Sequence, residues 1–338
     1  MKQVGNFFIL MLFIAGVLFS ISCNSCQSKK GTLVMEPYRQ VSPDFNADSA
    51  YVFVAKQVGF GPRVPGSTAH KACGDYLVSK LSEFGAQVTE QKAEIIHYDG
   101  RDLYIRNIIG SYHPEKERRV LLFAHWDTRP FADEEPDAGS QYQPIAGADD
   151  GASGVGVLLE IARSLHHDPV ERGVDIIFFD MEDWGQPSFE TDWVQGEWWC
   201  RGSQYWSEQP HVENYKAEYG ILLDMVGSAN ATFLKEGYSK QYAPAVLEKV
   251  WSIAAKLGYG NYFQSKNGGY ITDDHLLVNR HHRAPSINII NLRTDSHTGF
   301  VQHWHTHRDD MRNIDRNSLK VVGQTVMELI YSEPVKID

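Results

Sequence analysis

Four short, almost entirely apolar segments constrain the fold of this chain more than any other feature of its sequence. They read RVLLFA (119–124), VDIIFF (174–179), YGILLDMVG (219–227) and PSINIINL (285–292). Continuous apolar runs of this length are typical of strands that are covered on both faces, as in a parallel sheet between two layers of helices. The rest of the chain therefore has to supply helices that pack on both sides of such a sheet.

Helical patterns alternate with these segments, as a covered sheet requires. Periodicity predicts helices over residues 46–58, 68–84, 151–165, 242–257 and 317–331. RGSQYW (201–206) is typical of the start of a further helix, and Gly85 of a helix C-terminus. Residues 87–96 and 103–111 alternate like antiparallel strands. The succession predicts an α/β fold, a three-layer α/β/α sandwich with a mixed, largely parallel central sheet.

The composition is that of a globular protein with an acidic surface. The 338 residues are 42% hydrophobic and 22% charged, and the formal net charge is −11. This charge argues against nucleic acid as a partner, since the phosphate backbone is also negative. No Pro/Gly-rich linker interrupts the body of the chain, so we expect residues 36–338 to form a single domain.

The first residues form a separate segment. Lys2 precedes the apolar run FFILMLFIAGVLFSIS, which is short for a membrane span and leads through small residues to Cys23. This pattern predicts a signal peptide over residues 1–22, with Cys23 as a lipidated first residue and 23–35 as a tether. The expected location is the periplasm, with membrane contact only through the lipid. Ordinary cleavage and an uncleaved anchor are the alternatives, because Ser20 stands where leucine is more usual.

Two cysteines, Cys73 and Cys200, belong to the body of the chain. An exported protein could pair them, and the sequence leaves this open. Their spacing is not that of a zinc finger.

Histidines and carboxylates recur where the predicted strands end. The set consists of His125, Asp127, Asp149, Asp150, Glu182, Asp183, Asp224 and His305. Sites in α/β sheets lie beyond the carboxyl ends of the strands, so we expect these side chains to converge. A set of histidines and carboxylates without cysteine suits zinc with an open position for chemistry. Because neighbours in extended chain point in opposite directions, one of Glu182 and Asp183 can bind the metal while the other acts as general base.

Each of these residues also has an ordinary explanation. Asp149 and Asp150 precede a helix and could cap it, and acidic residues after a strand are commonly solvated turns. Asp224 differs, because a carboxylate within ILLDMV needs a partner if it is buried. The joint occurrence in this order favours a metal site.

The order AHWDT, GADDGASG, FFDMED, LLDMVG and WHTHRDD resembles that of the zinc-dependent exopeptidases of bacteria. More closely, it resembles the glutaminyl-peptide cyclotransferases, the glutaminyl cyclases of animals and some bacteria, which share that fold. The resemblance covers most of residues 36–335. The motifs specific to the cyclases are fewer, namely TDDH (272–275) and GFVQHWHT (299–306).

The resemblance implies a role for each matching residue. Asp150, Asp183 and His305 match the zinc ligands, and Glu182 matches the general base and acid. Asp224 and Asp273 match acids that hydrogen-bond to the general base and to the reacting groups. Aromatic residues would line the pocket for the glutamine side chain. These are Trp304, Phe300 and a loop tryptophan, for which we expect Trp193, with Trp198 and Trp199 as alternatives.

Two departures bear on the metal. Asp183 stands where the family commonly has glutamate, so the metal or the strand must shift by about a methylene. His125 and Asp224 match residues that hold a second zinc in two-zinc aminopeptidases; His125 and Asp127 could hold such an ion or support the ligands from behind. One zinc ion is expected for a cyclase and two for an aminopeptidase.

The predicted activity is glutaminyl-peptide cyclotransfer, an aminoacyltransferase reaction on peptides or proteins with N-terminal glutamine. The main alternative is a zinc aminopeptidase that hydrolyses N-terminal residues. A non-catalytic binding module on the peptidase fold is the remote alternative, since such modules usually lose the ligands. The sequence leaves the oligomeric state open, and a monomer is expected.

Overall fold

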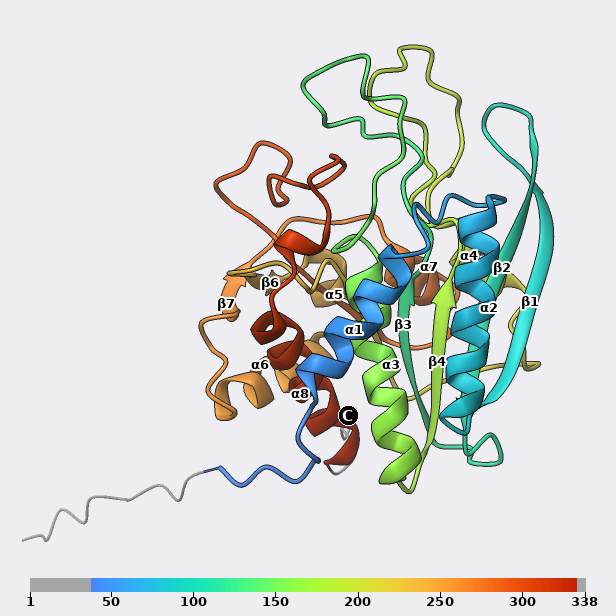
Figure 1. The fold of residues 1–338 in the computed structure, drawn as a ribbon. Helices are drawn as coiled ribbons and strands as arrows, with labels where there is room; N and C mark the ends of the chain where they lie inside the picture. The colour runs from blue at the N-terminus through green and yellow to red at the C-terminus, as the bar shows by residue number, and fades with distance from the viewer. Residues whose placement is uncertain (1–37, 333–338) are drawn as a thin grey trace, which may run out of the picture. The chain divides into compact units, whose positions relative to one another are not determined.

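A six-stranded sheet lies at the centre of the fold (Figure 1). The computed structural model describes residues 38–332. In spatial order the strands run β1-β2-β4-β3-β5-β8. Their bounds are β1 Gln87–Ile96, β2 Asp102–Tyr112, β3 Arg119–His125, β4 Gly173–Phe179, β5 Gly220–Asp224 and β8 Ser286–Ile290. Two further short strands, β6 (Phe233–Lys235) and β7 (Phe263–Asn267), pair with each other.

The sheet is mixed, with a parallel core. Strands β4, β3, β5 and β8 are parallel neighbours, whereas β2 pairs antiparallel with β4 and β1 antiparallel with β2. Both antiparallel pairings involve the hairpin of β1 and β2. Residues of β1 are exposed or partly buried, whereas the second half of β2, which pairs with β4, is buried. All residues of β4, β5 and β8 are buried, as their apolar sequences require. The predicted α/β class with a largely parallel sheet is confirmed.

Helices cover both faces of the sheet. They are α1 Ala47–Val58, α2 Thr68–Glu83, α3 Ala152–His167, α4 Arg201–Glu208, α5 Gly237–Tyr242, α6 Pro244–Lys256, α7 Asp274–Arg280 and α8 Arg316–Tyr331, with a 3-10 turn at Met311–Asn313. In the view of Figure 1, α1, α2, α3 and α8 lie in front of the strands, and α4 and α7 lie behind them. The arrangement gives the three layers that the sequence predicts.

Alternate residues of the central strands pack into two separate hydrophobic cores, one on each face of the sheet. Phe178 of β4 and Leu223 of β5 face the larger core, which contains residues of α1, α2, α3 and α8. Phe179 of β4 and Leu222 of β5 face a smaller core, together with Trp206 of α4. Burial on both faces explains why these strands carry no polar alternation, and it fixes their register.

Helix α3 lies unusually close to the parallel strands. A side chain at Gly154 would collide with the backbone carbonyl of Leu223, and one at Gly151 would come within 2.6 Å of Cε1 of His125. Only glycine permits this approach at either position. The close packing sets the N-terminus of α3 against the carboxyl ends of β3 and β5.

The predicted helices and strands are found within a few residues of their expected bounds. Strand β5 is shorter than the predicted 219–227, because Met225 takes a positive φ of 47° and turns the chain out of the sheet. Elements α5, α7, β6 and β7 were not expected, since each has at most seven residues and leaves no clear period.

Three sequence-based interpretations concern the ends of the chain and the cysteines. The expected signal peptide, Cys23 and tether lie outside the described residues. Within the described part, no helix combines the length and apolarity needed to cross a membrane. Cys73 and Cys200 are both buried and free, so they are not paired with each other.

Candidate active site

A cavity of about 390 Å³ opens beyond the carboxyl ends of the parallel strands. Carboxylates lie at its base, and apolar and aromatic side chains form its walls. The lining residues are Asp150, Glu182, Asp183, Trp199, Asp224, Met225, Tyr270, Ile271, Thr272, Asp273, Ile290, Phe300, Trp304 and His305. Eight of the eleven predicted site residues therefore line one cavity; His125 and Asp127 lie buried beneath it, and only Trp193 is elsewhere.

Asp150, Asp183 and His305 form a candidate metal centre. All three are buried, and their ligand atoms lie within 4.8 Å of one another. Nε2 of His305 is 3.1 Å from Oδ1 of Asp183 and 3.7 Å from Oδ2 of Asp150. Oδ2 of Asp183 is buried without a hydrogen-bond partner, which is costly unless a cation or proton lies there. Two carboxylates and one imidazole with this geometry fit a zinc ion.

The ligand-bearing loops are held from behind by other carboxylates. Asp309 accepts hydrogen bonds from the backbone N–H groups of Asp149 (2.8 Å) and Asp150 (3.1 Å). Asp127 accepts from those of Glu182 and Asp183, both at 3.2 Å. These contacts leave the side chains of Asp150, Glu182 and Asp183 free to face the cavity.

The two acids of the GADD motif have different surroundings. Asp149 accepts a hydrogen bond from the N–H of Gly227 at 2.7 Å and another from Oγ of Ser228. These contacts tie the start of α3 to the chain that follows β5. Asp150 instead turns toward the metal candidates, so the motif combines a structural acid with a ligand candidate.

The side chains of Glu182 and Asp183 point in different directions, as expected for neighbours in extended chain. Asp183 faces His305, whereas Glu182 faces Cys200 and Asp273, whose ligand atoms lie within 4.8 Å of those of Glu182. The thiol of Cys200 donates to Oε1 of Glu182 at 3.2 Å. Burial, and next the charge of Asp273, raises the pKa of Glu182 well above its usual value. The position suits a proton-transferring group at the cavity floor.

Two hydrogen bonds fix the carboxylate of Asp273. Its Oδ2 accepts from Nδ2 of Asn288 at 2.6 Å, and its Oδ1 accepts from the N–H of Asp274. Burial, followed by the charge of Asp224, raises the pKa of Asp273. The pKa of Asp274 is likewise raised by burial and by Asp273, which adds to the concentration of acidic groups at this end of the sheet.

His125 and Asp224 form a second group that includes Asp150. Nε2 of His125 is 3.0 Å from Oδ1 of Asp150 and 3.3 Å from Oδ1 of Asp224. The partner that a carboxylate within ILLDMV requires is thus His125. Nδ1 of His125 lies 3.4 Å from Asp127, so the imidazole bridges the acids rather than facing the cavity.

Aromatic rings wall the cavity, and they correct one sequence-based prediction. The rings of Trp304 and His305 are stacked with centroids 3.7 Å apart, and Phe300 packs on Trp304 at 4.6 Å. The loop tryptophan in the lining is Trp199. The predicted Trp193 is 66% exposed and does not line the cavity. Gln186 binds the backbone of Asp192 and Val194 on either side of Trp193 and so holds its loop in a turn outside the site.

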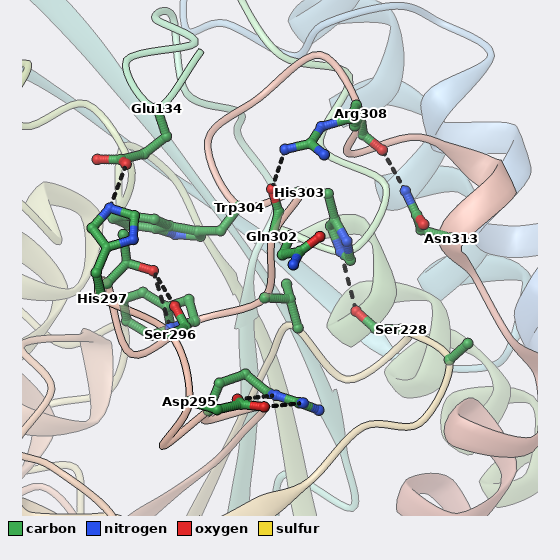
Figure 2. A pocket seen from close by; sticks show the side chains of 15 residues that line it. Glu134, Ser228, Asp295, Ser296, His297, Gln302, His303, Trp304, Arg308 and Asn313 are labelled. Atoms are coloured by element: carbon green, nitrogen blue, oxygen red, sulfur yellow. Dashed lines mark hydrogen bonds and ion pairs between the residues drawn. The ribbon is translucent and has the colours of Figure 1, made fainter. Parts of the chain in front are cut away.

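A second cavity of about 540 Å³ lies beyond Phe300 and Trp304, which line both cavities (Figure 2). The charged groups around it contact one another or the backbone. Glu134 faces His297 at 3.7 Å, Asp295 pairs with Arg293 at 3.0 Å, and Arg308 donates to the carbonyl of Gln302. The second cavity adjoins the candidate active site without adding a free acid or base to it.

Sequence reasoning missed four residues that shape the site. Arg129 and Asp133 lie in the loop after β3, where no periodic pattern marks them. The sequence marks Cys200 only as a candidate disulfide partner, and it places Asp309 within the WHTHRDD motif without indicating a role. In each case the signal is a contact with a residue distant in sequence, which a single sequence does not record.

Comparison with known proteins identifies the relatives of this chain. Residues 107–330 match Peptidase family M28. A crystal structure of a Zn-dependent exopeptidase from Parabacteroides distasonis is 57% identical, with a TM-score of 0.85 over 86% of this chain and 100% of that one. A crystal structure of Bacteroides thetaiotaomicron glutaminyl cyclase bound to N-acetylhistamine is 56% identical, with a TM-score of 0.84 over 87% and 100%.

A more distant relative is Aminopeptidase YwaD of Bacillus subtilis, which is 26% identical over 282 residues. The match covers 81% of this chain, and the chain spans about half (54%) of that protein's length. These similarities confirm the predicted zinc exopeptidase-like fold.

Proposed function

The chain belongs to peptidase family M28, and from this premise we propose that it is a glutaminyl-peptide cyclotransferase. The reaction converts the N-terminal glutamine of a peptide or protein to pyroglutamate and releases ammonia. The observation that carries the proposal is the 56% identity to a glutaminyl cyclase over 87% of this chain and the whole of the crystallised cyclase chain. The walls of the cavity agree, because aromatic and apolar side chains suit the flat, uncharged amide of a glutamine side chain.

Asp150, Asp183 and His305 would hold one zinc ion. When bound, the ion supplies Lewis acidity toward the carbonyl oxygen of the side-chain amide. Asp183 replaces the commoner glutamate without loss of the cluster, since its Oδ1 lies 3.1 Å from Nε2 of His305.

Glu182 would move the proton. In the reaction the substrate's α-amine nitrogen forms a bond to the amide carbon of the side chain, and the bond from that carbon to its amide nitrogen breaks. Glu182 accepts the proton that the amine loses and delivers it to the departing nitrogen, which leaves as ammonia. No water is consumed, and holding the amine against the amide supplies much of the acceleration.

Asp273 and Asp224 would orient the reacting groups beside Glu182. Asp273 is fixed by Asn288 and faces the same part of the cavity as Glu182, where the leaving nitrogen would lie. Trp304, Phe300 and Trp199 would hold the amide plane and exclude water. Arginine and lysine are missing from the lining, so a cationic N-terminus is favoured over an acidic side chain.

A zinc aminopeptidase is the second candidate. It is favoured by the group of His125, Asp150 and Asp224, whose ligand atoms lie within 4.8 Å of one another and could hold a second ion. A non-catalytic binding module is less well supported, because a full set of ligand and proton-transferring side chains converges on one cavity.

Mass spectrometry of a glutamine-initiated peptide incubated with the purified, zinc-loaded protein tests the proposal. Loss of ammonia from an otherwise intact peptide is the expected result. Release of free glutamine would establish the aminopeptidase, and an unchanged peptide would leave a binding module. Metal analysis of the same preparation should find about one zinc per chain for the cyclase and about two for the aminopeptidase.

The cellular setting follows from the N-terminal sequence. A lipoprotein-type leader over residues 1–22, with Cys23 as the lipidated first residue, would place the enzyme in the periplasm, anchored by lipid and acting there as a monomer. Its substrates would be exported peptides and proteins that begin with glutamine after cleavage. Radiolabelled fatty-acid incorporation, lost in Cys23→Ser, tests the anchor.

A further inference from the structure

A fully buried guanidinium, that of Arg129, lies beneath the candidate active site. Its Nε and Nη2 donate to the two carboxylate oxygens of Asp133 at 2.9 and 2.6 Å. Both side chains come from the loop after β3, which is neither helical nor extended there. A paired, two-pronged contact of this kind fixes the orientation of both groups.

The carboxylate of Asp133 passes this orientation to a candidate metal ligand. Oδ1 of Asp133 lies 3.0 Å from Nδ1 of His305, the nitrogen opposite the one that faces Asp150 and Asp183. A carboxylate at this nitrogen holds the imidazole so that Nε2 is the metal-binding atom. The remaining oxygen of Asp133 also accepts from the N–H of Ser188 at 3.0 Å.

Arg129 also contacts the backbone where the chain leaves the Glu182–Asp183 pair. Its Nη1 donates to the backbone carbonyls of Asp183 (2.9 Å) and Gly185 (3.1 Å). The guanidinium therefore holds the backbone of a second candidate ligand in addition to the imidazole of the first.

A third contact reaches the cavity wall. The guanidinium lies over the ring of Trp199, 4.5 Å from its centroid. The ring of Trp199 is nearly parallel to that of His305, with an angle of 10° between the planes. A cation over an aromatic face is attractive, more so when both are out of water.

We propose that Arg129 is a positioning residue that couples the metal centre to the aromatic wall of the substrate cavity. One buried cation fixes His305 through Asp133, the backbone of Asp183 directly, and Trp199 through its ring. The inference rests on the proposed zinc site, because the coupling has a purpose only if Asp183 and His305 hold a metal. Loss of the guanidinium would therefore loosen both the candidate ligands, Asp183 and His305, and the aromatic wall at Trp199.

A second arginine–aspartate pair, in which Asp175 is buried and Arg119 partly buried, offers a matched control. Arg119 grips Asp175 in the same two-pronged manner, with Nε–Oδ2 at 2.5 Å and Nη2–Oδ1 at 2.8 Å. This pair lies at the other end of the parallel strands, where β3 and β4 begin. Its loss should cost stability without touching the metal centre.

The test measures zinc affinity of the full chain by competition with a chromophoric chelator. The variants are Arg129→Met, Arg129→Lys, Asp133→Asn and the control Arg119→Met. Arg129→Met and Asp133→Asn should bind zinc about 10- to 100-fold more weakly, the usual effect of removing a group that orients a metal ligand. Arg129→Lys should recover part of the affinity, because it keeps the charge but not the fork. Arg119→Met should bind zinc as the wild type does.

Kinetics of the zinc-saturated variants provide the second readout. Arg129→Met should raise KM for a glutamine-initiated peptide through the loosened Trp199, while Arg119→Met leaves KM unchanged. Zinc affinity equal to wild type in folded Arg129→Met and Asp133→Asn would overturn the proposal. If Arg129→Met does not fold, Asp133→Asn decides. An enzyme that binds zinc as predicted but does not cyclise glutamine would refute the proposed function and leave this inference intact.

Discussion

The two ends of strand β4 handle buried carboxylates in opposite ways. At its beginning, Asp175 accepts hydrogen bonds from four side-chain donors, two of them from Arg119 and the others from Ser111 and Tyr215. Just beyond its end, Glu182 accepts one weak bond from the thiol of Cys200 and faces other acids.

This difference distinguishes carboxylates that have a structural role from carboxylates that are available for function. A buried carboxylate that is fully satisfied contributes to the fold and has no capacity left for a ligand. A carboxylate left with free lone pairs destabilises the fold unless a metal, a proton or a substrate occupies them. The two kinds thus lie at opposite ends of β4, and substitutions at the two ends should affect different properties.

The largest expected effect is a loss of turnover, caused by a substitution just beyond the carboxyl end of β4. Glu182→Gln should lower kcat for a glutamine-initiated peptide about a thousandfold, because the amide cannot accept the amine proton. Stability should not fall, since a poorly satisfied buried charge is removed. The measurement is steady-state ammonia release, with thermal unfolding and zinc content as controls; turnover close to wild type would exclude Glu182 as the base.

Asp175→Asn should produce the reverse pattern at the other end. It removes the buried carboxylate that pairs with the partly buried Arg119, so the free energy of unfolding should fall by about 1.5 to 3 kcal/mol, the usual worth of hydrogen bonds to a charged group. Urea denaturation gives this value, and zinc affinity of the remaining folded protein should equal wild type. Weakened zinc binding at unchanged stability would contradict the separation of the two ends.

The exposed and cavity-lining tryptophans extend the comparison to the loop after β4. Trp199→Ala should raise KM about five- to tenfold, because it removes an aromatic wall worth about 1 kcal/mol. Trp193→Ala, at a side chain that is largely in water, should leave KM and kcat unchanged. Equal effects of the two substitutions would mean that the loop reorganises around the substrate.

The smallest expected effect concerns the single donor to Glu182. Cys200→Ala should lower kcat about three- to tenfold by removing one hydrogen bond, and Cys200→Ser should retain most of it. Cys73→Ala is the matched control, being the other buried free cysteine of the described chain, in helix α2 and outside the cavity lining. A loss in the serine variant as large as in the alanine variant would point to packing rather than to the hydrogen bond.

The sequence predicted the elements that have a strong period or a fully apolar run. The strands β3, β4 and β8 are recognisable because both of their faces are buried, so their composition alone marks them. Helices α5 and α7 were missed because six or seven residues do not complete a readable pattern. Their place is set by packing against β8 and α4 rather than by local preference.

The acids at the cavity followed from the sequence for a similar reason. Parallel strands bring their carboxyl ends to one edge, so residues after Phe179 and within β5 had to converge. No comparable rule predicts that Glu182 contacts Cys200 or that His305 contacts Asp133. Nothing local in the sequence distinguishes Trp199 from Trp193, because both lie in an irregular loop.

The sequence by itself determined the fold class, the edge of the sheet where the chemistry gathers and the identity of its acids, because hydrophobic periodicity and chain direction are local properties. The tertiary structure alone decided which carboxylates are satisfied and which remain free. It also decided which tryptophan faces the cavity, and that Arg129 links the ligands to the wall. Those outcomes depend on distances between segments far apart in the chain, which side-chain packing fixes only after the whole sheet is assembled.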